Sequence, residues 1–321
     1  MGMADTVTKE YIRSNEVFAD AFNYLIYDGE QVVKPALLQE LDTTEIAIPF
    51  ALGENENQTE DVVQKYRDVL KSAVIMQDSR ASYILLGVEN QTEIHYAMPV
   101  RNIIYDALQY GKQVSEVAKR HKSKGDRKGH NKGEYLSGFY KEDRIRPVIT
   151  LVVHFGADEW DGPLSLYEMM DLEDKKLLEF VQDYRIFLID PYKLTNEDLE
   201  KFSSSLGDVL GYIKYSKDKK ALSKFLNDNQ VMIMDNDAAR VIRDVTNTPI
   251  YVPDGKGEID MCKAVRDMID ESKQEGMAAG ELNKAKKMAL KMYKKGDSIE
   301  EIAEMAEVSV DQVKEWINSA V

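Results

Sequence analysis

Two acidic residues occupy matching positions near the outer ends of a predicted β-hairpin. Its arms are residues 68–76 and 81–88, both rich in Val, Leu and Ile, and the polar residues between them predict a turn. A loop of two residues places Asp68 directly opposite Glu89. Opposed carboxylates repel each other, and a divalent cation bound between them removes that repulsion. The alternative is an edge hairpin whose acids are simply solvated at its open end.

The residue two positions beyond Glu89 indicates what chemistry the acids can do. Gln91 points to the same side of the strand as Glu89, because side chains alternate along a strand. Many metal-dependent nucleases have an Asp, a Glu further along the chain, and a Lys two residues after that Glu. Here Gln91 stands in the Lys position. A metal ion held by such acids activates water and steadies the charge on a phosphate. The arrangement therefore indicates hydrolysis of a phosphodiester bond.

The sequence around these residues resembles a known family. Residues 65–71 (KYRDVLK) and 87–110 (GVENQTEIHYAMPVRNIIYDALQY) resemble the PD-(D/E)XK nuclease family transposases, also called Rpn or YhgA-like recombination-promoting nucleases, and the likeness is looser over 18–29, 147–156 and 160–170. The resemblance implies an α/β fold with a restriction-endonuclease-like core, in which helices flank a central mixed sheet. It also implies a DNA endonuclease of recombination or transposition that uses Mg²⁺, or Mn²⁺ in its place, and leaves 5′-phosphate ends.

The resemblance further implies a role for each residue of the site. Asp68 and Glu89 match the metal-binding acids, assisted by the backbone carbonyl of Asn90. Gln91 is the third catalytic residue and orients the water or a phosphate oxygen. Asp20 matches an acid of the first helix that approaches the metal, and its alternative is a solvated helix residue.

The Gln in the Lys position also favours a second function. It leaves the transition state without its usual cation, so the fold can instead serve as a DNA-binding or protein-interaction module with little or no catalysis. A metal titration separates the two functions, because only the nuclease requires tight binding of Mg²⁺ or Mn²⁺ that depends on Asp68 and Glu89.

One clearly basic segment, residues 119–132, is a candidate contact to DNA. It holds seven Lys or Arg and a single acid, and its Gly, Ser and Asn content predicts a flexible loop. Such a loop beside a nuclease site suits the clamping of phosphates, and its alternative is a solvated surface loop. Arg101 either binds a phosphate or forms an ion pair with Asp106 or another nearby acid. The candidate DNA-binding residues are Arg101, Lys119, Arg120, Lys122, Lys124, Arg127 and Lys128.

A sheet with helices around it is needed to position these residues. An amphipathic helix is predicted over residues 8–27, and a helix that begins near Pro99 follows the Glu89 strand directly. Residues 145–156 are a continuous apolar run, typical of a buried strand, and 183–191 predict another. The remaining predictions are a strand or strand pair within 32–52, two helices over 195–228 and a helix over 237–247.

The end of the chain predicts a separate helical extension. We divide the chain into a nuclease-like domain, 1–255, and an all-helical extension, 256–321. The extension begins with a long helix that Gly296 ends, followed by two short helices in a helix-turn-helix pattern. The motifs Ser298-x-x-Glu301 and Ser309-x-x-Gln312 predict capping boxes at their starts. The second short helix has two acids and one Lys, which favours packing or homodimer formation over reading DNA.

Composition narrows the functional classes. The chain of 321 residues has a formal net charge of −15, so any DNA contact must come from a local basic patch. Cys262 is the single cysteine, which excludes an internal disulfide and fits a reducing cytoplasm. Neither a secretory signal nor an apolar run long enough to span a membrane is present, so we expect a cytoplasmic protein without membrane contact.

Overall fold

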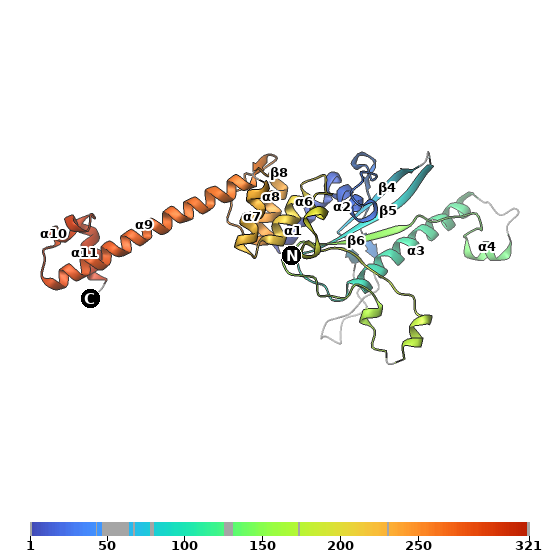
Figure 1. Cartoon of the computed structure of the whole chain (residues 1–321). Coiled ribbons are helices and arrows are strands. Elements are labelled where there is room, and N and C mark those ends of the chain that lie inside the picture. The colour runs from blue at the N-terminus through green and yellow to red at the C-terminus, as the bar shows by residue number, and fades with distance from the viewer. Residues whose placement is uncertain are drawn as a thin grey trace. The chain divides into compact units, whose positions relative to one another are not determined.

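The computed structural model describes residues 2–42, 44–46, 64–66, 68–77, 80–124, 131–172, 174–229 and 231–319 (Figure 1). The chain forms two compact units. The first comprises Met1–Thr248 and Val252–Asp260, and the second comprises Pro249–Tyr251 and Met261–Val321. No helix in the described ranges combines the length and the apolar character needed to cross a lipid bilayer.

A five-stranded mixed sheet is the centre of the first unit. The strand order is β1-β4-β5-β6-β7; β1, β4 and β5 are antiparallel neighbours, whereas β6 is parallel to β5 and to β7. The predicted α/β class with a mixed sheet and a helical end is therefore confirmed. The strands of the sheet are β1 (Gln39–Glu40), β4 (Val69–Gln77), β5 (Arg80–Gln91), β6 (Val148–His154) and β7 (Phe187–Ile189). Two small antiparallel pairs are β2 (Thr44–Ile46) with β3 (Gln64–Tyr66), and β8 (Ile233–Asp235) with β9 (Glu258–Asp260).

The β4–β5 hairpin has the predicted register. Gln77 pairs with Arg80 and Val69 pairs with Val88, so Asp68, which directly precedes β4, comes level with Glu89. The two loop residues lie outside the described residues. The strand β5 is longer than its predicted range because it also pairs in parallel with β6, up to Gln91, and a local hairpin pattern cannot indicate a partner so distant in the chain.

Two helices, α1 (Met3–Arg13) and α2 (Asn15–Tyr27), replace the single helix predicted over residues 8–27. The break lies at Ser14, whose ψ of 136° is not helical. The buried Lys71 of β4 explains it, because its ammonium group donates hydrogen bonds of 2.5 Å to the Arg13 carbonyl and to the Asn15 side chain. A continuous helix would use that carbonyl internally, and a buried ammonium group needs such acceptors. Burial lowers the pKa of Lys71.

The sheet is covered on both faces. Lys71 and the residues on the same face of β4 lie toward α1 and α2. On the other face, Leu70 and Leu85 pack with Tyr110 of α3 (Met98–Lys124). The prediction of a flexible loop over 119–132 is wrong for its first part, because residues 119–124 are the last turns of α3. Basic residues suit that position, since cations stabilise the carboxyl end of a helix. Residues 125–130, and with them Arg127 and Lys128, lie outside the described residues.

Short helices complete the first unit. The prediction of two helices over 195–228 is incomplete, because the structure has three there, and the helix predicted over 237–247 is confirmed. They are α4 (Lys132–Ser137), α5 (Asn196–Leu199), α6 (Leu206–Tyr215), α7 (Lys219–Asn229) and α8 (Asn236–Thr246). Short 3₁₀ helices lie at Pro35–Leu37, Tyr167–Met169, Lys175–Phe180 and Pro191–Lys193.

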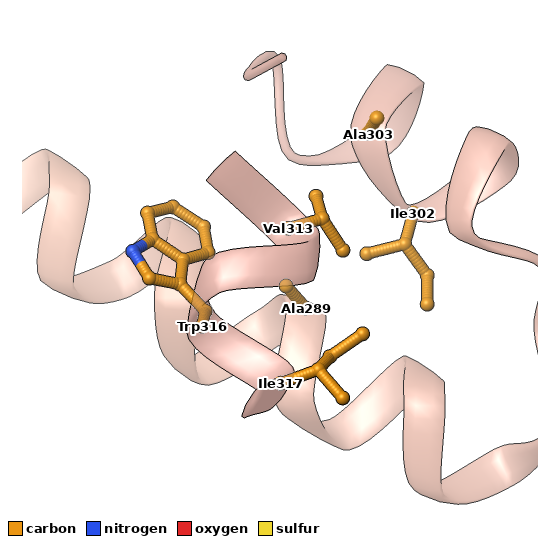
Figure 2. Close-up of a cluster of buried hydrophobic side chains, with 6 residues drawn as sticks. All are labelled: Ala289, Ile302, Ala303, Val313, Trp316 and Ile317. Atoms are coloured by element: carbon orange, nitrogen blue, oxygen red, sulfur yellow. The ribbon is translucent and has the colours of Figure 1, made fainter. Parts of the chain in front are cut away.

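The second unit is helical, as predicted. A long helix, α9 (Met261–Lys295), ends before Gly296, whose φ of +97° favours glycine, and α10 (Ile299–Met305) and α11 (Val310–Asn318) follow. Ser298 and Glu301 form the predicted capping box. Ser309 accepts from the Gln312 backbone N–H, but the Gln312 side chain donates to Glu315 and does not close a box. Figure 2 shows the core that joins the three helices: Ala289, Ile302, Ala303, Val313, Trp316 and Ile317.

Replacing Trp316 with Ala is expected to destabilise the packing of α9, α10 and α11 by about 3 kcal/mol or more, because it leaves a cavity in a small core. Native-state hydrogen exchange of the α11 amides in the full chain measures this loss. Met305→Ala is the control, because Met305 is 63% exposed, and its effect is expected to stay within about 0.5 kcal/mol. Equal losses in the two variants would contradict the assignment of the core.

Candidate functional site

The two predicted acids lie together at the end of the hairpin, and both are buried. Asp68 is 8% exposed and Glu89 is fully enclosed. The Asp68 Oδ2 atom accepts a hydrogen bond of 2.9 Å from the backbone N–H of Asn90, the residue after Glu89. The Asp68 carboxylate is therefore fixed across the ladder, against the strand segment that carries Glu89.

Each acid has a basic partner from a different helix. Lys9 Nζ of α1 lies 2.9 Å from Asp68 Oδ1, and Arg101 Nη2 of α3 lies 2.9 Å from Glu89 Oε2. Buried carboxylates need such partners, because an uncompensated charge in the interior is costly. Burial acts to lower the pKa of Arg101, but Glu89 counteracts it and the net pKa is raised, so the guanidinium stays charged.

These ion pairs identify the acid that pairs with Arg101 and add Lys9 to the residues of the site. The Asp106 carboxylate accepts from Thr150 and from Tyr184, at 2.6 Å each, so the acid that pairs with Arg101 is Glu89. Sequence reasoning missed Lys9, because nothing in the spacing of the chain relates the first helix to Asp68.

The segment after Glu89 presents its polar groups in a fixed arrangement. The Gln91 side-chain amide donates to the Asn90 carbonyl at 2.9 Å. The Asn90 side chain donates to the Thr8 hydroxyl of α1 at 2.6 Å. The Gln91 carbonyl accepts from the backbone N–H of Phe155 at 2.8 Å. The backbone at Asn90 and Gln91 is thereby held between α1 and the residue that follows β6.

The donor set at the hairpin end suits a hard divalent cation. Mg²⁺ binds through one or two carboxylates and keeps several waters, so Asp68, Glu89 and the carbonyl of Asn90 are a fitting set of oxygens. Within the residues that the structure describes, no three His, Cys, Asp or Glu side chains gather in a way that could hold a metal.

Asp20 lies elsewhere in the first unit. Its buried carboxylate accepts hydrogen bonds of 2.7–3.0 Å from the N–H and hydroxyl groups of Ser203 and Ser204, just before α6. On the neighbouring helix α1, the Tyr11 hydroxyl is hydrogen-bonded to the Ser205 hydroxyl at 2.9 Å. Among the described residues, the structure thus does not gather Asp20 with Asp68 and Glu89 into a metal-binding group.

The predicted basic residues lie along α3. Arg101 is in its first turn, whereas Lys119 begins the basic end about 27 Å further along the helix, at about 1.5 Å per residue. The basic end therefore does not border the acid pair, and a bound duplex would have to follow the helix to reach both. Arg120 lines a cavity of about 360 Å³ together with three cations that sequence reasoning missed because they are spread along the chain, Lys112, Arg144 and Arg146, and with two acids, Asp42 and Glu116. The described members of this basic end are Lys119, Arg120, Lys122 and Lys124.

Comparison with known proteins supports the resemblance found in the hairpin. Residues 49–238, more than half of the chain, match the model of a family described as putative transposase, YhgA-like. No curated protein and no solved structure matches the chain. The matched region contains Asp68, Glu89, Gln91 and Arg101, whereas Lys9 and Asp20 precede it.

Replacing Asp20 with Asn is expected to lower the free energy of unfolding by about 2–3 kcal/mol, because charged acceptors of buried N–H groups contribute strongly. The affinity for Mn²⁺ should stay unchanged. Urea denaturation and calorimetric titration measure the two quantities. Asp28→Asn is the control, because the Asp28 side chain is 82% exposed in its ion pair with Lys201 and should contribute less than about 1 kcal/mol. Weaker metal binding at unchanged stability would instead assign Asp20 to the metal.

Proposed function

The chain belongs to the YhgA-like transposase family, and from this membership we propose that it is a metal-dependent DNA endonuclease that acts in recombination or transposition. The observation that carries the proposal is the pair of buried acids, Asp68 and Glu89, held level at the end of the hairpin. The antiparallel hairpin that continues into a parallel strand, with helices on both faces, supports a restriction-endonuclease-like core. The reaction is hydrolysis of a phosphodiester bond.

Each group of the site has a task in this reaction. Asp68, Glu89 and the Asn90 carbonyl would hold Mg²⁺ or Mn²⁺, which would supply activation of the attacking water and stabilisation of the charge on the phosphate. The side-chain amide of Gln91 lies against the Asn90 carbonyl and can turn to orient the water or a phosphate oxygen.

We assign the missing positive charge of the motif to Lys9. Its ammonium group already lies 2.9 Å from Asp68, so it is within the site although it belongs to α1. Lys9 and Arg101 supply positive charge beside the two acids, and electrostatic stabilisation of a phosphate by such groups would be a large contribution to catalysis. Arg101 and the basic end of α3 hold the DNA backbone.

One observation favours the second candidate function, a DNA-binding or protein-interaction module with little catalysis. Lys9 and Arg101 neutralise both acids, so the described structure satisfies its buried charges from within the chain. In such a module the four residues would be a structural charge cluster that joins the helices to the sheet. Binding of metal and cleavage of DNA distinguish the two functions.

Asp68→Asn and Glu89→Gln are each expected to reduce metal-dependent cleavage of supercoiled plasmid DNA by at least about 100-fold, because even residues that only support metal ligands contribute 10–100-fold. Plasmid relaxation with Mg²⁺ and with Mn²⁺ measures the rate, and circular dichroism checks that each variant is folded.

Glu93→Gln is the matched control for this experiment, because Glu93 is an exposed acid just beyond the strand. Its rate should equal that of the unchanged chain. Cleavage at full rate by both site variants would place the chemistry elsewhere. A chain that neither cuts DNA nor binds Mn²⁺ would be the interaction module.

Lys9→Met is expected to slow cleavage on the order of 100-fold, as the loss of one electrostatic donor does in other enzymes. Mn²⁺ should bind at least as tightly as before, because the variant removes a competitor for the Asp68 carboxylate. Lys9→Arg should recover part of the rate, and Lys34→Met, at an exposed position, should change neither quantity. Metal affinity that falls in step with the rate would show that Lys9 only holds Asp68 in place.

A further inference from the structure

A second basic segment lies in the last turns of α9. Between Leu282 and Gly296 the sequence contains six lysines and no acid, in a chain whose formal net charge is −15. Its lysines are interspersed with apolar residues, so the segment is less obvious in the sequence than the basic segment at 119–132. The six lysines are Lys284, Lys286, Lys287, Lys291, Lys294 and Lys295.

Five of these lysines form one exposed ridge. The apolar residues Ala285, Ala289, Leu290 and Met292 pack toward α10 and α11, as Figure 2 shows for Ala289. Successive residues are rotated by about 100°, since a turn has 3.6 residues, so the lysines at the intervening positions point away from that core. We call Lys284, Lys287, Lys291, Lys294 and Lys295, all of them exposed, the lysine stripe.

The lysine stripe is unfavourable for the isolated chain. Lysines three or four residues apart on a helix repel each other, and Lys287 and Lys291 have lysines and no acid at these distances. None of the ion pairs found among the described residues includes a member of the stripe. The helix dipole stabilises Lys294 and Lys295 in the last turn, but not the members further back.

Apart from Glu281, which lies three residues before Lys284 on α9, the acids nearest to the stripe in the sequence belong to the segment that follows α9. The segment from Asp297 to Glu315 carries seven acids and one lysine, and Glu301 is engaged in the capping box. The second unit therefore has one strongly basic helix face, while its helix-turn-helix pair is acidic. An acidic α11 is poorly suited to read a major groove, and the basic face is the surface that attracts a polyanion.

We infer that the lysine stripe binds the phosphate backbone of duplex DNA without regard to sequence. The inference rests on the proposed function in one respect only, that DNA is the molecule on which the chain acts. From Lys284 to Lys295 the stripe extends about 16 Å along the helix, which is comparable to four or five phosphate steps of one strand at about 3.4 Å each. Each lysine can therefore meet a separate phosphate.

The composition of the stripe favours DNA over a protein partner. Lysine is depleted in protein–protein interfaces, whose centres are apolar and aromatic, and the stripe has no such centre. Contacts from lysine to phosphate supply most of the non-specific binding of DNA. A second copy of this chain, docking its acidic α10 and α11 on the stripe, is the competing occupant that the experiment must distinguish.

The test compares binding of the full chain to two fluorescein-labelled duplexes of unrelated sequence, by anisotropy at several salt concentrations and without divalent metal. The variant Lys287→Gln/Lys291→Gln/Lys294→Gln should bind both duplexes at least about tenfold more weakly near 0.1 M salt. The slope of log K against log salt should fall by about 2–3, close to 0.9 for each phosphate contact removed. The control variant Lys219→Gln/Lys220→Gln/Lys224→Gln removes three exposed lysines from α7 and should bind as the unchanged chain does.

Further outcomes separate this inference from the proposed function. Binding that depends on the stripe, in an unchanged chain that cuts no DNA with Mg²⁺ or Mn²⁺, would support the stripe while the nuclease proposal fails. Equal binding by the stripe variant and the unchanged chain would overturn the inference. The inference would also be overturned if light scattering showed that the stripe variant differs from the unchanged chain in oligomeric state and this difference accounted for the whole loss of affinity. The occupant of the stripe would then be a second copy of the chain.

Discussion

Two buried carboxylates at neighbouring strand ends constrain the arrangement of the whole first unit. Asp68 and Glu89 cannot both stay charged in the interior without positive partners, because an uncompensated buried charge costs several kcal/mol. The partners come from opposite sides of the sheet, Lys9 from α1 and Arg101 from α3. Both helical layers must therefore meet the same end of the hairpin. The buried Lys71 supports this arrangement, because it fixes the corner between α1 and α2 on β4.

The sequence was most informative where the determining contacts are local. A two-residue loop and two apolar arms fix the register of the hairpin, and with it the approach of Asp68 to Glu89. Helix ends that depend on neighbouring residues, such as the stop at Gly296 and the capping box at Ser298, were predictable for the same reason. The family resemblance added the identity of the motif, which geometry alone left open against a solvated edge hairpin.

Contacts between distant parts of the chain were not predictable from these patterns. The break at Ser14 depends on a buried lysine in β4, and the length of β5 depends on its pairing with β6. Asp20 shows the same limit, because the family resemblance implied a metal ligand at this position, whereas the hydrogen-bond partners of its carboxylate are serines 183 and 184 residues later. The lysine stripe was not predicted from the sequence for a different reason. Its charge is visible only when the helical period is combined with knowledge of which face is packed.

The attachment of α1 has a consequence for the time at which the site is completed during synthesis. The hydroxyl of Tyr11 is hydrogen-bonded to that of Ser205, 194 residues later, and Lys9 belongs to the same helix as Tyr11. At a translation rate of 5–20 residues per second, Ser205 is synthesised roughly 10–40 s after Tyr11. The hairpin acids emerge well before the contact that fastens the Lys9 helix can form. A nascent chain on the ribosome therefore carries the two carboxylates long before it has the complete charge cluster.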